Sequence, residues 1–289
     1  MRVFRDLNNL PQFNNSVVTI GTFDGVHLGH QKLIERITAQ AKRIGGESII
    51  VTFNPHPRIV INPEDKSLKL LNTIEEKIAL LEQYGVDNVV VVPFSRDFSE
   101  QSAEEYISNF LVKNFQPKYI VIGYDHRFGK NRSGDYKLLE QVKGQYGYEI
   151  EEITKETLDD IEISSTKIRK ALAEGDVSLA NDLLGHRYTL GGNIVKGFQN
   201  GRKLGYPTAN IQVADAYKLI PRMGVYAVLV LFGCSRAFSG PALQSLLPQV
   251  VPRERLVEAH AKNALASSGP EVAGPALGGM LIKALGPPL

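Results

Sequence analysis

The feature that most constrains the fold is the alternation of short apolar runs with amphipathic segments between residue 17 and about residue 180. The apolar runs are five to nine residues long, which suits buried strands, and most of the segments between them have helical spacing. Strands that are apolar on both faces and alternate with helices form a parallel sheet covered by helices on both sides. The runs are VVTIG (17–21), SIIVTF (48–53), VDNVVVVPF (86–94) and KYIVIGYD (118–125), and the stretch YEIEEI (148–153) follows the last helical segment before residue 163.

The helical segments carry recognisable start and stop signals. The first, residues 28–46, has apolar residues at helical spacing and ends in two glycines. Two later segments begin with a hydroxyl residue followed three positions on by glutamate, the pattern of a capping box. These pairs are Thr73 with Glu76 and Ser102 with Glu105. The sequence therefore predicts an α/β domain with a parallel sheet.

The pattern changes twice towards the C-terminus. After residue 184 the chain becomes glycine-rich with short strand-like runs, which is typical of a small β-barrel or sandwich. From Cys234 onward alanine, proline, glycine and leucine dominate, and the strand pattern is lost. We therefore expect a first domain over 1–184, the first part of a second domain over 185–233, and an atypical, poorly ordered tail over 234–289.

Composition excludes several classes of function. The net charge of +2 arises from dispersed lysines and arginines, so a nucleic-acid groove is not expected. No apolar run approaches the roughly 20 residues of a membrane span, and the N-terminus lacks the apolar core of a signal peptide. The single cysteine excludes a disulfide framework. We expect a cytoplasmic protein with neither nucleic-acid nor membrane partners.

The stretch GTFDGVHLGH (21–30) follows the first apolar run and leads into a helix. A glycine-rich turn at a helix N-terminus is suited to bind an anion, because free N–H groups and the helix dipole point towards it. His27 and His30 lie three residues apart, so on a first helical turn they share a side and can donate to phosphate oxygens. A His-x-x-His metal site and a purely structural turn are the alternatives. The G-x-G-x-x-G spacing of dehydrogenases is absent.

The stretch resembles the H-x-G-H signature of nucleotidyltransferases, whose acceptors include phosphopantetheine, nicotinamide mononucleotide and glycerol phosphate. Three further stretches narrow the resemblance. Together with TFNPHP (52–57), IGYDHRFGKNRSG (122–134) and ISSTKIR (163–169), it resembles the adenylyltransferase module of the bacterial bifunctional riboflavin kinase/FMN adenylyltransferases, also called FAD synthetases. The resemblance covers residues 15–185 and implies a Rossmann-like nucleotidyltransferase domain followed by a small, here incomplete, riboflavin-kinase-like β-barrel.

The resemblance implies transfer of AMP from MgATP to FMN, giving FAD and pyrophosphate, with FMN and FAD as substrate and product. His27, His30 and Arg169 would be catalytic, and Mg²⁺ would be carried by ATP without a dedicated protein cage. The expected ATP-binding residues are Gly21, Thr22, Phe23, Asp24, Gly25, Gly29, Ser164, Ser165 and Thr166. The expected flavin-binding residues are Asn54, Pro55, His56, Pro57, Asp125 and Phe128, although a core position for Phe128 fits the sequence equally well.

Residues 191–211, including the PTAN segment, resemble the opening of the riboflavin kinase module. Gly192, Gly197, Thr208 and Asn210 are the expected ATP and magnesium residues there. After Phe232 no further match is visible by motif, and Glu258 is the one candidate for a catalytic base. Riboflavin is thus an expected substrate, but the kinase activity is left open. The alternatives to FAD synthesis are transfer to another phosphorylated acceptor and a flavin- or nucleotide-binding protein without turnover.

Overall fold

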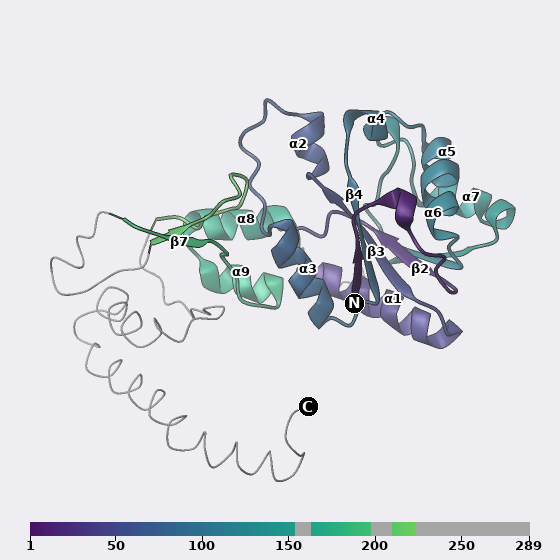
Figure 1. Ribbon diagram of the computed structural model, residues 1–289, viewed down its shortest axis with the longest axis horizontal. Coiled ribbons are helices and arrows are strands. Elements are labelled where there is room, and N and C mark those ends of the chain that lie inside the picture. Colours follow the sequence, from purple (N-terminus) through teal and green to yellow (C-terminus); the bar gives the residue numbers. More distant parts are fainter. Residues whose placement is uncertain (154–162, 198–209, 224–289) are drawn as a thin grey trace, which may run out of the picture. The chain divides into compact units, whose positions relative to one another are not determined.

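The computed structural model describes residues 1–153, 163–197 and 210–223 (Figure 1). The chain divides into two compact units. The first comprises Met1–Gly191 together with Asp215–Arg222, and the second comprises Gly192–Ala214 with Met223–Leu289. The segment 215–222 therefore belongs structurally to the first unit, although it follows residues of the second in the sequence.

The first unit contains a six-stranded sheet in which every neighbouring pair is parallel. The strand order is β1-β4-β3-β2-β5-β6. From β2 the chain proceeds outward through β3 to β4, then returns to place β5 on the other side of β2. The order reverses between β2 and β5, and open α/β sheets bind ligands outside the carboxyl ends of strands at such a point. The strands are β1 (Arg2–Phe4), β2 (Val17–Ile20), β3 (Ser48–Asn54), β4 (Asn88–Pro93), β5 (Tyr119–Gly123) and β6 (Glu149–Ile153).

Helices cover both faces of this sheet (Figure 1). The α-helices are α1 (Leu28–Ile44), α2 (Pro57–Ile61), α3 (Ile74–Gln83), α4 (Arg96–Ser99), α5 (Ala103–Glu105), α6 (Lys113–Phe115), α7 (Tyr136–Tyr146), α8 (Ser165–Glu174) and α9 (Val177–Leu184). A π-helical segment, η2 (Tyr106–Val112), joins α5 to α6, and single 3₁₀ turns occur at η1 (Leu7–Asn9) and η3 (Lys130–Arg132). The predicted α/β fold class is confirmed.

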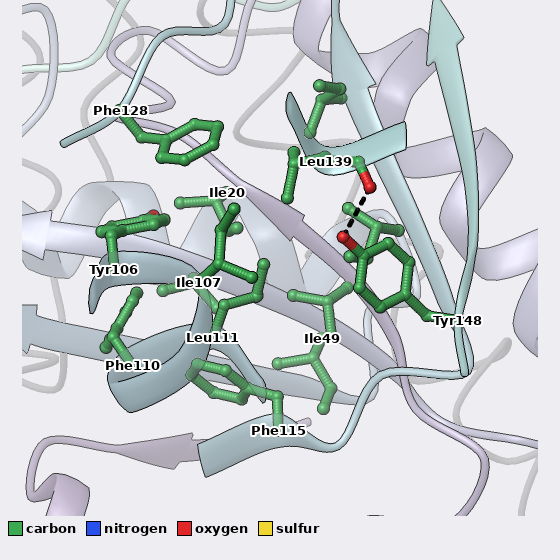
Figure 2. Packing of buried hydrophobic residues seen from close by; sticks show 14 of the residues in the cluster. Ile20, Ile49, Tyr106, Ile107, Phe110, Leu111, Phe115, Phe128, Leu139 and Tyr148 are labelled. Carbon is green, nitrogen blue, oxygen red and sulfur yellow. Dashed lines mark hydrogen bonds between the residues drawn. The ribbon is translucent and has the colours of Figure 1, made fainter. Parts of the chain in front are cut away.

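Successive strand residues point to opposite faces and build two separate cores. Val17 and Ile50 pack with α1 and α3, whereas Val18 and Ile49 pack with the α5–η2–α6 helix and α7. Figure 2 shows the second of these clusters, in which the Tyr148 hydroxyl donates to the Leu139 carbonyl oxygen at 2.7 Å. The near-continuous burial of β2, β3 and β4 explains why these strands are apolar on both faces.

The two expected capping boxes are both present. Thr73 caps α3 and Ser102 caps α5, and in each case the glutamate three residues on returns a bond to the backbone of the cap. The helix that begins at Ser102 differs from the expected regular one, because its middle is π-helical. Edge strand β1 was not predicted, since two exposed residues and one half-buried residue give too short a pattern.

In the second unit the structure describes one antiparallel pair, β7 (Asn193–Val195) with β8 (Asn210–Gln212). Ile194 lies opposite Ile211 in this ladder. The remaining strands expected of a barrel, and the expected tail, lie outside the described residues.

Candidate active site

The turn between β2 and α1 has an unusual backbone. Phe23, Gly25 and Val26 all have positive φ, at 48°, 90° and 41°. This region is costly for a β-branched residue such as valine, so the surrounding contacts must hold the turn in place. A Cβ on Gly25 would stand 2.7 Å from Leu71 Cδ1, which makes glycine necessary there on steric grounds as well. The space at Gly25 is therefore filled by the protein itself rather than left open for a phosphate.

His27 and His30 meet at the N-terminus of α1. Their imidazole rings stack with centroids 3.7 Å apart and planes inclined by 14°, and Phe23 lies 5.0 Å from the His30 ring. His27 is the N-cap of α1, and its Nδ1 accepts the backbone N–H of His30 at 3.4 Å. Gly29 allows this arrangement, because a Cβ there would stand 3.3 Å from His27 Nδ1. The structure thus brings the two histidines together as their spacing predicts.

Both histidines are neutral near pH 7. Burial lowers the pKa of His27 from 6.5 to about 4, against an opposing effect of the Asp24 charge. Burial also lowers the pKa of His30 well below 6.5, and the neighbouring His27 and Lys77 act in the same direction. Since Nδ1 of His27 accepts a hydrogen bond, the proton of its neutral ring is on Nε2. His27 can therefore offer one N–H donor without carrying a charge.

Asp24 links the β2–α1 turn to two distant segments. Its Oδ1 accepts the backbone N–H groups of Leu71 at 2.9 Å and Asn72 at 3.3 Å, and its Oδ2 pairs with Arg169 Nη2 at 2.6 Å. Asp24 is 2% exposed, so the pair is shielded from water. Arg169 also donates from Nε to the Lys69 carbonyl oxygen at 2.7 Å. Arg169 thus lies at the β2–α1 turn, where Asp24 takes up one end of its guanidinium group.

The serines and the threonine before α8 have separate positions. Ser164 is the N-cap of α8, where it accepts the Lys167 N–H. The Ser165 hydroxyl donates to the Asp24 carbonyl oxygen at 2.9 Å, so α8 begins against the β2–α1 turn. Thr166 is exposed on the first turn of the helix. The start of α8 and the start of α1 therefore lie at the same place, and both are helix N-termini that favour an anion.

Lys77 is a site residue that was missed from the sequence. It lies on α3, is 6% exposed, and donates from Nζ to the Thr22 carbonyl oxygen at 2.6 Å and to Thr52 Oγ1 at 3.3 Å. Burial lowers its pKa from 10.5 to about 8, so it carries a positive charge beneath the turn at pH 7. A signal was present: Lys77 stands three and four residues before the buried Leu80 and Leu81, on the apolar face of the helix.

The loop after β3 carries the first group of expected flavin residues. Asn54 ends β3 and is exposed, as is Pro55, while Pro57 is the first residue of α2. His56 caps α2 by accepting the Arg58 N–H on Nδ1 at 3.2 Å. Burial lowers the pKa of His56 to about 4, and the charges of Asp24, Lys77 and Arg169 all act on it. His56 therefore belongs to the same electrostatic neighbourhood as the β2–α1 turn.

The loop after β5 carries the second group. Asp125 is exposed just beyond the end of β5. Phe128, in contrast, is 6% exposed and stacks on Tyr106 with ring centroids 4.9 Å apart, so it lies in the core cluster of Figure 2. Its backbone forms two hydrogen bonds with Gly134, whose missing side chain leaves room for the ring. Phe128 therefore occupies the core position that fitted the sequence equally well.

The expected kinase residues are only partly described. A Cβ on Gly192 would stand 2.6 Å from the Gln212 carbonyl oxygen, and one on Gly197 would stand 2.3 Å from Asn210 Nδ2. These glycines accommodate β8 and its side chains, which differs from the expectation that they leave room for ATP. Asn210 begins β8. Thr208 and Glu258 lie outside the described residues.

Two absences among the described residues bear on the kind of site this is. None of the helices there combines the length and apolar character needed to cross a membrane. Nor does that part of the chain hold a group of three or more His, Cys, Asp or Glu side chains arranged to bind a metal ion.

An open parallel sheet whose order reverses beside a glycine- and histidine-bearing helix N-terminus is the architecture of an α/β protein that binds a ligand at the carboxyl ends of its strands. Comparison with known families identifies which one. Residues 10–167 match the FAD synthetase family and residues 184–270 match the riboflavin kinase family. The chain belongs to the family of bifunctional riboflavin kinase/FMN adenylyltransferases, as its motifs predicted, and is therefore an enzyme of a transferase family. ATP, FMN and riboflavin are substrates of this family, and FAD is a product.

Curated relatives with that name support the assignment over most of the chain. The protein from Buchnera aphidicola is 38% identical over 91% of this chain and 85% of its own length. The protein from Listeria monocytogenes is 40% identical over 74% of this chain and 67% of its own length. The protein from Escherichia coli is 35% identical over 90% of this chain and 83% of its own length. The riboflavin kinase match continues to residue 270, beyond Phe232, where motif resemblance was expected to stop. The match includes the position of Glu258.

A solved structure has the same fold. It is described as a macrolide-efflux protein from Streptococcus pneumoniae, and it is 31% identical to this chain with a TM-score of 0.68. The likeness covers 78% of this chain and 72% of that one. The efflux description applies to that protein, and what the two chains share is the arrangement of the sheet and helices.

Proposed function

We propose that the first unit adenylylates FMN at the site where the β2–α1 turn, α8 and the loop after β3 converge. A phosphate oxygen of FMN attacks the α-phosphorus of ATP, the bond between the α-phosphorus and the bridging oxygen breaks, and pyrophosphate leaves. The observation that carries the proposal is the stacked pair of neutral histidines at a helix N-terminus, with ring centroids 3.7 Å apart, beside the turn at which Asp24 pairs with Arg169. No general base is required, because the attacking phosphate is ionised near pH 7.

His27 and His30 act as neutral donors to the oxygens on which charge accumulates in the transition state. Donors of this kind are already oriented before the substrate binds, since the stack and the N-cap fix both rings. Arg169, Ser164, Ser165 and Thr166 bind the departing pyrophosphate at the N-terminus of α8. Within the described part of the chain, Arg169 donates hydrogen bonds to other residues from Nε and Nη2, which leaves Nη1 to donate to a phosphate oxygen. Lys77 adds a positive charge beneath the turn.

Mg²⁺ enters with ATP, and its bonds are to phosphate oxygens and water rather than to a set of protein carboxylates. The residues present fit that role, because the one buried carboxylate of the turn, Asp24, is already engaged by two N–H groups and a guanidinium. Asn54, His56 and Asp125 would orient the flavin from the ends of β3 and β5, where these strands flank β2. Phe128 lies buried in the core beneath the loop that carries Asp125.

We also propose that the second unit phosphorylates riboflavin, with the family match through residue 270 as its support. The adenylyltransferase module would occupy residues 1–184, with the kinase module following from residue 185. Thr208 and Asn210 would bind MgATP there.

The test is a paired assay on the purified full chain, in which riboflavin with MgATP and FMN with MgATP are followed separately by chromatography. We expect FAD from FMN, and loss of that product on removal of Mg²⁺ with EDTA. His27→Ala and His30→Ala should each lower kcat by about 100- to 1,000-fold, the effect of removing one oriented donor. Glu35→Ala, an exposed position on the same helix, is the matched control. Near wild-type turnover in both histidine variants would refute the proposed roles.

A further inference from the structure

A short segment of the chain's second part is built into the first unit. Residues 215–222, called the strap here, lie in the range that matches the riboflavin kinase family yet pack within the unit that contains β2, α1 and α8. Leu70 forms a parallel bridge with Lys218: the Leu70 N–H donates to the Tyr217 carbonyl oxygen at 2.7 Å, and the Leu219 N–H donates to the Leu70 carbonyl oxygen at 2.8 Å.

Lys218 is the most buried part of the strap. Its side chain has no exposed surface, and its Nζ donates to the Leu71 carbonyl oxygen at 2.6 Å and to Glu76 Oε2 at 2.6 Å. The ammonium group also lies 4.4 Å from the ring centroid of Tyr188, whose hydroxyl donates to the Leu219 carbonyl oxygen at 2.6 Å. A lysine is almost never buried this fully unless it is paired, so its position is closely specified.

The loop 69–72 lies between the strap and the candidate active site. On one side its backbone contacts site residues: Lys69 accepts from Arg169, while Leu71 and Asn72 donate to Asp24. On the other side Leu70 bonds to the strap through both N–H and carbonyl, and the Leu71 carbonyl accepts from Lys218. Buried backbone groups need partners, so a shift of the strap would have to be accommodated by the loop that holds Asp24.

The strap also contacts α8, which carries Arg169. Leu219 packs in the cluster that contains Ile168, the neighbour of Arg169 in sequence, together with Leu172. The Arg222 N–H donates to the Leu172 carbonyl oxygen at 3.0 Å. The strap thus holds both elements that Asp24 joins, the loop 69–72 and α8.

We propose that Lys218 is a positioning residue for FMN adenylylation, acting through Leu71 on the Asp24–Arg169 pair. This inference rests on the proposed function of the first unit. FAD synthesis accordingly depends on a lysine that lies outside the FAD synthetase match at 10–167 and inside the riboflavin kinase match.

The test compares Lys218→Met with Lys170→Met in the full chain. Lys170 is an exposed lysine on α8 with a side chain 75% exposed, so its replacement removes a charge near Arg169 without touching the loop. Assays run well below the unfolding temperature of every variant, with kcat and KM for ATP measured separately. We expect Lys218→Met to lower kcat/KM at least tenfold and Lys170→Met to change it less than twofold.

A double-mutant cycle with Arg169→Lys separates positioning from general loss of stability. If Lys218 acts through Asp24 and Arg169, Lys218→Met should lower kcat/KM less than threefold in a chain that already carries Arg169→Lys. The proposal would be overturned if the double variant showed the product of the two single-variant losses in kcat/KM. It would also be overturned if Lys218→Met changed kcat/KM no more than Lys170→Met does. If Lys218→Met does not fold, Tyr188→Phe, which removes one hydroxyl that bonds the strap, replaces it in the cycle under the same criteria. A wild-type chain that makes no FAD would instead refute the proposed function.

Discussion

At Gly29, helix stability and site geometry make opposite demands. Gly29 is the second residue of α1, where alanine would gain up to about 1 kcal/mol in helix propensity. A Cβ there would stand 3.3 Å from His27 Nδ1 and 3.4 Å from His27 Cε1, so the imidazole would have to move. That movement disturbs the stack on His30 and the N-cap bond, and losing such a bond costs roughly 0.5–2 kcal/mol. The two contributions to stability nearly cancel.

We therefore expect Gly29→Ala to change the free energy of unfolding by less than about 1 kcal/mol while lowering kcat for FAD formation at least about tenfold. Urea denaturation and single-turnover FAD formation at saturating MgATP measure the two quantities. Gly144→Ala is the control, since a Cβ there contacts nothing within 4 Å and gains only helix propensity. An unchanged kcat in Gly29→Ala would refute the requirement for the present ring position. An equal loss of stability and activity would indicate a folding defect instead.

Lys77 and His27 are buried groups whose lowered pKa values make stability depend on pH. Burial lowers the pKa of Lys77 from 10.5 to about 8, a cost of about 3 kcal/mol at pH 7 that disappears as pH rises from 8 to 10.5. Lys77→Met should therefore be more stable than wild type at pH 7 but not at pH 10.5 in denaturant titrations, and should form FAD more slowly. Burial also holds the pKa of His27 at about 4, so the stability it contributes is present above pH 6.5 and lost as pH falls towards 4. His27→Gln should reduce the loss of unfolding free energy between pH 7 and pH 4 by about 3 kcal/mol relative to the wild type. The same dependence of unfolding free energy on pH in the variant and the wild type would contradict this.

The features that could be predicted from the sequence are those that depend on neighbouring residues. Apolar runs predicted the four strands β2 to β5, and hydroxyl–glutamate pairs predicted the starts of α3 and α5, because caps and strand burial are encoded within a few positions. The His27–His30 pair was predictable for the same reason, since a helical turn brings residues three apart together. The edge strand β1 and the π-helical segment depend on packing against β4 and the sheet, so local pattern did not reveal them.

The features that were missed join positions far apart in the chain. Asp24 and Arg169 are 145 residues apart, and Lys218 lies 147 residues from Leu71. No spacing rule connects such pairs, and a single sequence carries no record of their proximity. A lysine within an amphipathic helix is ordinarily assigned to the solvent face, which is why Lys77 was overlooked. Only its position beside Leu80 and Leu81 distinguished it.

These long-range contacts explain how a buried carboxylate is compatible with the triphosphate site proposed at this turn. An unpaired Asp24 would repel phosphate, but two backbone N–H groups and the Arg169 guanidinium surround it. The carboxylate then serves to fix the guanidinium, and Lys77 supplies a further positive charge beneath the turn. The site therefore keeps a positive balance towards an anionic substrate while its histidines stay neutral. An oriented guanidinium and neutral N–H donors need little rearrangement as charge moves to the pyrophosphate, which is the condition for stabilising that transition state.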